Sequence, residues 1–128
     1  EVKSERDMWQ RTGNIAIEFQ SYGKPSGINA TEADYWFHNL CIGNETYATL
    51  VFKTEVLRKI ISSLDYKRIV NGGDHNASRM YLLNIQKLFS SDVIKAFKEG
   101  DKSNENYKTN KPDSEGNATK SQTKTSDT

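Results

Sequence analysis

The sequence predicts an α/β (α+β) sandwich, in which strands come first and helices and strands then follow one another. Residues 14–20 alternate between apolar and polar side chains, which is typical of a half-buried strand. Two apolar runs, 37–42 and 47–52, flank a polar turn at 43–46 and predict a β-hairpin. Residues 55–64 carry apolar side chains at helical spacing and predict a helix.

The remaining elements of the first half follow from local patterns. Residues 1–4 resemble the end of a strand, with Val2 directed into the core. Residues 21–29 contain two glycines and a proline, so we expect a loop. Thr31 and Asp34 fit a capping box, which predicts that a short helix starts there.

The second half is predicted from caps and short apolar runs. Thr54 is a suitable N-cap for a helix over residues 55–63. Strands are expected at 68–70 and 80–85. Ser91 can cap a last helix over residues 92–98, which Gly100 would end.

Composition excludes several classes of protein. The chain has 128 residues, of which 34% are apolar and 27% charged, with a net charge of +1. This balance excludes nucleic-acid binding by bulk charge alone and an acidic solvating protein. No apolar run has the length of a membrane span, so we expect no membrane partner. The single cysteine, Cys41, cannot form an internal disulfide, which favours a reducing, cytoplasmic location.

We expect one folded domain over residues 1–100, followed by a disordered polar tail over 101–128. The tail has Tyr107 and Ala118 as its only apolar residues, too few to offset the entropy of ordering it. The chain opens directly in a strand, which predicts a fragment whose upstream part is absent.

The first three residues, Glu1-Val2-Lys3, carry the clearest candidate chemistry. In a strand, Glu1 and Lys3 point to the same face. A carboxylate there can bind Mg²⁺, which prefers oxygen ligands. The lysine can orient a water or stabilise charge that develops on phosphate. Such triplets also occur by chance, so the motif alone is not specific.

Longer motifs follow in the same order as in one known family. They are Glu1-Val2-Lys3, Thr12-Gly13-Asn14-Ile15-Ala16-Ile17-Glu18, Gly23-Lys24-Pro25-Ser26-Gly27-Ile28, Thr31-x-Ala33-Asp34-Tyr35-Trp36 and, later, Gly72-Gly73-Asp74. Residues 1–98 thereby resemble phage-type nucleases of the PD-(D/E)XK superfamily.

The resemblance implies a restriction-endonuclease-like core, a mixed sheet flanked by helices with a metal site at one sheet edge. Glu1 would match the metal-binding acid and Lys3 the catalytic lysine, with Mg²⁺ or Mn²⁺ as cofactor. The first acid of the motif, an aspartate on the preceding strand, has no counterpart here. The first helix of the family core is also missing.

Other residues are weaker candidates. Glu18 would complete the catalytic set if its strand neighbours residues 1–3, although an exposed strand residue is the alternative. Lys24, with Ser26 and the Gly27 amide, would contact a DNA phosphate; a plain surface turn is the alternative. The same role is assigned to two cations of the predicted helix, Arg58 and Lys59.

Aromatic residues and histidines have a structural and a functional interpretation. Of the adjacent Tyr35, Trp36 and Phe37, we expect core packing, while one ring could stack on an unpaired base. His38 and His75 are expected to be structural, with proton transfer and phosphate contact as the respective alternatives.

The sequence therefore predicts a Mg²⁺-dependent deoxyribonuclease that acts in the bacterial host cytoplasm, with DNA as partner and a homodimer as an alternative state. The competing hypothesis is a non-catalytic nucleic-acid- or protein-binding module on the same fold. The near-neutral charge and the missing aspartate motivate it.

Overall fold

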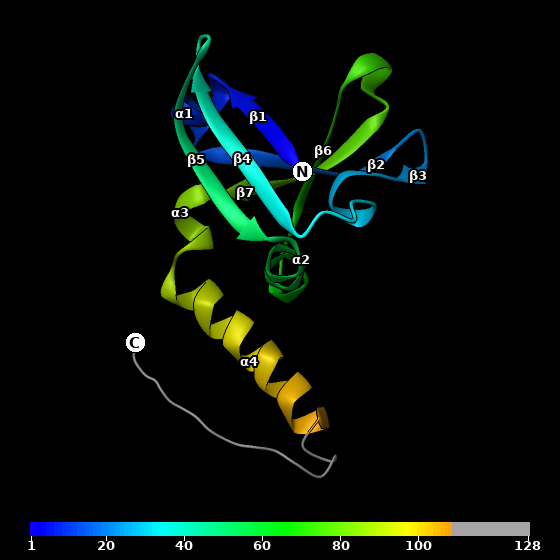
Figure 1. The fold of residues 1–128 in the computed structure, drawn as a ribbon, viewed down its shortest axis with the longest axis vertical. Coiled ribbons are helices and arrows are strands. Elements are labelled where there is room, and N and C mark those ends of the chain that lie inside the picture. The colour runs from blue at the N-terminus through cyan, green and yellow to red at the C-terminus, as the bar shows by residue number, and fades with distance from the viewer. Residues whose placement is uncertain (109–128) are drawn as a thin grey trace. The chain divides into compact units, whose positions relative to one another are not determined.

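The strands form two sheets in the computed structural model, which describes residues 1–108 and gives 101–108 by their backbone (Figure 1). One sheet has three strands and the other four, and four helices accompany them. The predicted mixed α+β class is confirmed.

The three-stranded sheet has the order β1-β4-β5. Its strands are β1 (Val2–Arg6), β4 (Tyr35–Ile42) and β5 (Glu45–Lys53). β4 and β5 form the predicted hairpin, with a register shift at Leu40/Cys41. β1 runs parallel to β4, with Val2 opposite Phe37, so this sheet is mixed. In the described part of the chain, β1 is therefore an edge strand.

The four-stranded sheet is antiparallel and has the order β3-β2-β7-β6. Its strands are β3 (Lys24–Pro25), β2 (Asn14–Ser21), β7 (Ser78–Asn84) and β6 (Arg68–Gly72). The strands predicted near residues 14–20, 68–70 and 80–85 are confirmed. Apolar alternation identifies the first of them, and short apolar runs identify the other two.

The helices are α1 (Met8–Thr12), α2 (Thr54–Ser63), α3 (Ile85–Leu88) and α4 (Ser91–Lys108), with 3₁₀ turns η1 (Gly27–Asn29) and η2 (Asp74–Asn76). α1 and α3 were not predicted, because each has too few residues for a helical period to appear in the sequence. None of the described helices combines the length and apolar character needed to cross a membrane.

Three local predictions were wrong. Residues 31–34 are irregular, because Thr31 Oγ1 accepts from Ala33 N in a turn and β4 starts at Tyr35. Lys53, and not Thr54, is the N-cap of α2; the Thr54 hydroxyl is buried without a hydrogen-bond partner in the described structure. α4 passes through Gly100, because its helical backbone continues to Lys108. The rest of the predicted tail, 109–128, lies outside the described residues.

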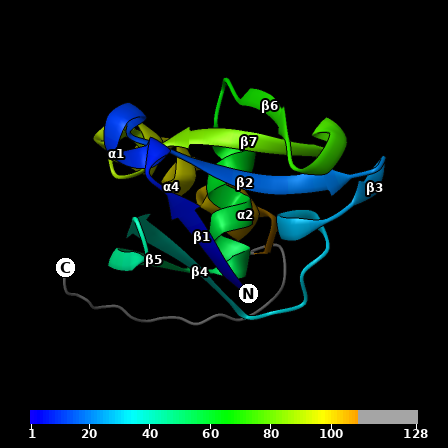
Figure 2. The same cartoon turned by 90° about the horizontal axis from the view of Figure 1, so that it is seen from above.

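The hydrophobic core lies between the two sheets, which Figure 2 shows as separate layers. Residues Glu1–Phe97 form one compact unit that contains it, and a second unit begins at Lys98. β2 contributes Ile15 and Ile17, β4 contributes Trp36, and α2 contributes Leu57, all fully buried. The alternation along β2 thus buries one face of the strand, as the pattern predicts.

Val2 is not a core residue, in contrast to the prediction. Its side chain is 66% exposed, whereas Lys3 and Glu5 on the other face of β1 are partly buried. The face of β1 that carries charge is therefore the one directed toward the rest of the molecule.

Candidate functional site

Glu1 and Lys3 lie together at the start of β1, as their shared strand face predicts. Lys3 Nζ is 3.1 Å from Glu1 Oε2. Thr31, from the irregular segment before β4, donates its hydroxyl to Glu1 Oε1 at 3.2 Å. Three side chains from two distant segments thus meet at the edge of the three-stranded sheet, and the Glu1 carboxylate is oriented by both neighbours.

The surroundings of Glu1 favour its charged form. The Lys3 ammonium, which donates a hydrogen bond to the carboxylate, holds the pKa of Glu1 below its ordinary value. Partial burial acts in the opposite direction, and the Thr31 hydroxyl adds to the lowering of the pKa. Glu1 is therefore ionised at neutral pH, which a metal-binding carboxylate requires.

The lowered pKa of Glu1 predicts how acid affects stability. Stability from the Glu1–Lys3 contact is present above the unfolded pKa, about 4.3 for a glutamate, and is lost as pH falls through the folded pKa. Unfolding free energies from urea titrations are expected to favour wild type over Glu1→Gln at pH 7, with the difference vanishing at strongly acid pH. A constant difference across this range would contradict the expected ionisation of Glu1.

The donor set at this edge offers one carboxylate for a divalent cation. Mg²⁺ commonly binds one or two carboxylates and takes its other ligands from water and phosphate, so Glu1 fits as one ligand. Among the side chains that the structure describes, those of residues 1–100, no group of three or more from His, Cys, Asp and Glu is placed to hold a metal.

Glu18 lies on β2 and is engaged by the loop that follows. Ser26 Oγ donates to Glu18 Oε2 at 2.7 Å, and Ser26 N donates to Phe19 O at 3.1 Å. Ser26 thus ties η1 to β2 at two points. The structure gives Glu18 this partner, while its predicted catalytic role and the predicted DNA contact of Ser26 stay predictions.

Gly27 permits a close approach between two backbone segments. Its φ is +51°, and a Cβ at this position would lie 2.1 Å from the carbonyl oxygen of Glu18. From the sequence, the Gly27 amide is expected to contact a DNA phosphate. In the structure, the approaching group is the backbone of β2.

Lys24 and Lys59 are both exposed, Lys24 in β3 and Lys59 on α2. Arg58 is hydrogen-bonded to two backbone carbonyls and to a carboxylate. Its Nε donates to Ile28 O at 2.9 Å and its Nη2 donates to Thr31 O at 2.7 Å. Its Nη1 pairs with the exposed Glu55. Arg58 therefore links η1 and the residues that follow it to α2. The phosphate contact predicted for Arg58 stays a prediction.

Replacing Arg58 by lysine should loosen this segment. A lysine has a single ammonium and cannot reproduce the planar set of donors that reaches both carbonyls. We expect Arg58→Lys to lower the free energy of unfolding by about 1–3 kcal/mol. Glu55→Gln, which removes only the exposed ion pair, should change it by less than about 0.5 kcal/mol. Equal effects in a denaturant titration would show that the carbonyl contacts do not matter.

A buried polar chain next to the Glu1–Lys3 pair was not predicted. His38 Nε2 lies 2.8 Å from Glu5 Oε1, and Ala16 N donates to the same oxygen at 2.8 Å. Trp36 Nε1 donates to His38 Nδ1 at 3.1 Å. Because an indole nitrogen can only donate, Nδ1 must accept, so the His38 proton resides on Nε2 and points at Glu5.

The alternation of residues along β1 already indicated that Glu5 belongs to this hydrogen-bonded group of side chains. Glu1, Lys3 and Glu5 occupy the same strand face, so an acid at position 5 had to lie on the same side of β1 as the candidate pair. The partner could not be inferred, because the pairing of β1 with β4 joins segments more than 30 residues apart. His38 is structural here, as predicted, and His75 is exposed in η2.

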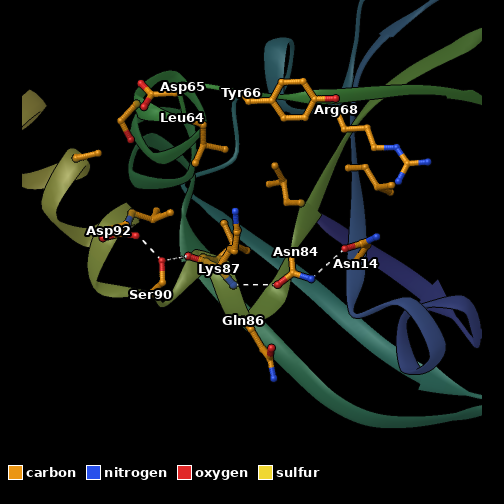
Figure 3. Close-up of a pocket in the computed structure, with 16 residues that line it drawn as sticks. Asn14, Leu64, Asp65, Tyr66, Arg68, Asn84, Gln86, Lys87, Ser90 and Asp92 are labelled. Carbon is orange, nitrogen blue, oxygen red and sulfur yellow. Dashed lines mark hydrogen bonds between the residues drawn. The ribbon is translucent and has the colours of Figure 1, made fainter.

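A cavity of about 740 Å³ in the first unit is lined by apolar and polar side chains. Figure 3 shows hydrogen bonds beside it that join Asn14 to Asn84 and Asn84 to Lys87. Another cavity, of about 530 Å³, is lined by Thr31 and Arg58, among others. Since Thr31 also contacts Glu1, this second cavity adjoins the candidate site.

In comparisons with protein-family models, with curated proteins and with solved structures, the chain shows no significant match. The resemblance to PD-(D/E)XK nucleases accordingly depends on the motifs alone.

Proposed function

We propose that the chain is the metal-binding and catalytic part of a DNA nuclease of the PD-(D/E)XK type. The observation that carries the proposal is the contact between Glu1 and Lys3 at the start of an edge strand, with the carboxylate kept ionised. This arrangement suits phosphodiester hydrolysis, which needs an oxygen ligand for a hard cation beside a group that stabilises charge on phosphate.

The roles of the residues follow from their contacts. Mg²⁺ or Mn²⁺, when bound at Glu1, would supply Lewis-acid stabilisation of the phosphate. Glu1 would hold the cation, with its orientation fixed by the Thr31 hydroxyl at 3.2 Å. Lys3, whose ammonium lies 3.1 Å from the carboxylate, would hold a water or a phosphate oxygen next to it.

The finer fold assignment belongs to the same proposal. A restriction-endonuclease-like core has a mixed sheet with its metal site at one edge. The mixed β1-β4-β5 sheet, with the Glu1–Lys3 pair on its edge strand, supports that assignment. The second, antiparallel sheet is a feature for which the motifs give no expectation.

Cleavage assays test the proposal. Linear, single-stranded and branched DNA are incubated with the chain in Mg²⁺, Mn²⁺ or EDTA. We expect cutting that needs the metal and falls at least about 100-fold in Lys3→Ala, because charge stabilisation in the transition state is lost. Lys95→Ala, an exposed lysine on α4, should cut like wild type.

Two other results would contradict the proposal. Metal-dependent cutting that survives Lys3→Ala would remove the role assigned to this lysine. Binding of DNA with no cutting under either metal would favour the alternative, a nucleic-acid-binding module on the same fold.

A further inference from the structure

The outer face of the three-stranded sheet is a second surface with recognisable chemistry. Cross-strand pairing arranges it in rows: Tyr35 opposite Lys53, then Val2-Phe37-Val51, then Ser4-Asn39-Thr49, with Arg6 at the far end of β1. These side chains point away from the core, as the burial pattern of each strand shows. We call them the outer-face set.

Two aromatic rings of β4 lie on this face. Tyr35 is 49% and Phe37 40% exposed, whereas Trp36 between them is fully buried in the core. The structure thereby separates the three adjacent aromatic residues: one ring stabilises the fold and two remain accessible. Because Tyr35 and Phe37 are two residues apart on one strand, their Cα atoms are about 6.6 Å apart along it.

Polar groups border the rings on one side. Thr49 Oγ1 donates to Asn39 Oδ1 at 2.7 Å, and Asn39 Nδ2 approaches Ser4 Oγ at 3.5 Å. The apolar part of the face thus consists of Tyr35 and the Val2-Phe37-Val51 row. The hydrogen-bonding row Ser4-Asn39-Thr49 lies next to it. Protein-binding patches are broader and more continuous, and exposed aromatic rings on a sheet are how several domains bind unpaired bases.

The charge of the face favours a polyanion. Arg6 and Lys53 lie at opposite ends, and Arg6 donates one hydrogen bond, from Nη1 to Gly43 O at 3.0 Å. The outer-face set contains no aspartate or glutamate, and the one acid of β5, Glu45, lies at the hairpin turn. Two copies of this face would bring cations against cations. A sugar–phosphate backbone would instead find positive charge at both ends of a row of rings.

We propose that the outer face of the β1-β4-β5 sheet binds single-stranded DNA, with bases stacked on Tyr35 and Phe37 and phosphates at Lys53 and Arg6. The inference rests on the proposed function only in taking DNA as the ligand, and it narrows the substrate to DNA with an unpaired segment. Because β1 is an edge strand, the bound strand can pass from this face around the edge to Lys3.

Binding in EDTA tests this inference apart from cleavage. The fluorescence anisotropy of fluorescein-labelled dT15 is measured with wild type, Tyr35→Leu, Phe37→Leu and the double variant. Leucine keeps an apolar side chain of moderate size but removes the ring. We expect each single variant to bind about 5- to 10-fold more weakly. Tyr66→Leu, at a tyrosine that is 79% exposed elsewhere, should bind like wild type.

Two further measurements are the salt dependence of binding and the comparison of single-stranded with duplex DNA. Lys53→Ala should reduce the slope of log Kd against log salt by about one. Circular dichroism confirms that each variant is folded. The inference is overturned if wild type does not bind dT15 at low salt, if the double variant binds it unchanged, or if a duplex of equal length binds as tightly. Ring-dependent binding by a protein that never cuts DNA would support this inference and contradict the nuclease.

Discussion

Replacing Gly27 by alanine is expected to destabilise the protein more than any of the other single substitutions proposed. The Cβ would lie 2.1 Å from the Glu18 carbonyl oxygen and 2.8 Å from its carbonyl carbon. Both are backbone atoms of β2, a strand whose side chains Ile15 and Ile17 are fully buried, so they cannot withdraw without disturbing the core. We expect a loss of more than about 3 kcal/mol, a large part of the stability of a small domain.

Gly23→Ala is the matched control for this prediction. Gly23 has a φ of +75° in the same loop, but a Cβ there would have no atom within 4 Å. Its substitution carries only the cost of a left-handed backbone, about 1–2 kcal/mol. The free energies of unfolding of the two variants, measured by thermal and denaturant unfolding, should differ by the cost of the Cβ clash alone. Similar losses in the two variants would mean that the approach of η1 to β2 is not close.

Replacing His38 by alanine should be the second most damaging change. The substitution leaves a cavity beneath the three-stranded sheet. It also removes the acceptor of the Trp36 indole and one of two hydrogen bonds to the Glu5 carboxylate, which keeps the bond from Ala16 N. We expect a loss of about 3–5 kcal/mol in the free energy of unfolding. His75→Asn, at the other histidine, keeps a residue type that tolerates its φ of 58° and should be nearly neutral.

The tautomer of His38 provides an independent check. Imidazole nitrogen chemical shifts should show the proton on Nε2, because Trp36 donates to Nδ1. A proton on Nδ1 would contradict the hydrogen-bond chain from Trp36 to Glu5, whatever the stability of the alanine variant.

The sequence predicts those parts of the fold that depend on local periodicity. The alternation at 14–20 identifies β2, and the apolar runs around Gly43 identify the β4–β5 hairpin. The helix predicted to start at 31–34 does not form. The Thr31 hydroxyl accepts a hydrogen bond from Ala33 N in a turn and donates one to Glu1, so it does not cap a helix. Tertiary contacts decided this segment, and a local pattern does not contain them.

The candidate site also contains some contacts that a local pattern predicts and others that only the tertiary structure shows. Strand alternation places Glu1 and Lys3 on one face, and the structure brings them within 3.1 Å. The Thr31 and His38 contacts join segments about 30 residues apart, so no spacing rule could predict them. Arg58 was also not predictable from its position in the sequence. A cation on an amphipathic helix is expected to face solvent, but the Arg58 guanidinium donates hydrogen bonds to the carbonyl oxygens of Ile28 and Thr31.

The two faces of β1 offer different chemistry. The face that carries Glu1, Lys3 and Glu5 is charged and partly buried. The opposite face contributes Val2, Ser4 and Arg6 to the outer-face set. As the edge strand of its sheet, β1 can present both faces to one extended ligand. A nuclease acting on unpaired DNA would use one face for hydrolysis and the other for binding.

Paramagnetic NMR can test whether Glu1 binds a divalent cation beside Lys3, as proposed. Mn²⁺ is titrated into the ¹⁵N-labelled chain, and the broadening of backbone amide signals is followed. We expect broadening first at Val2, Lys3 and Thr31, with Glu1→Gln needing at least about tenfold more Mn²⁺ for the same effect. Broadening centred on another segment, or unchanged by Glu1→Gln, would contradict the claim.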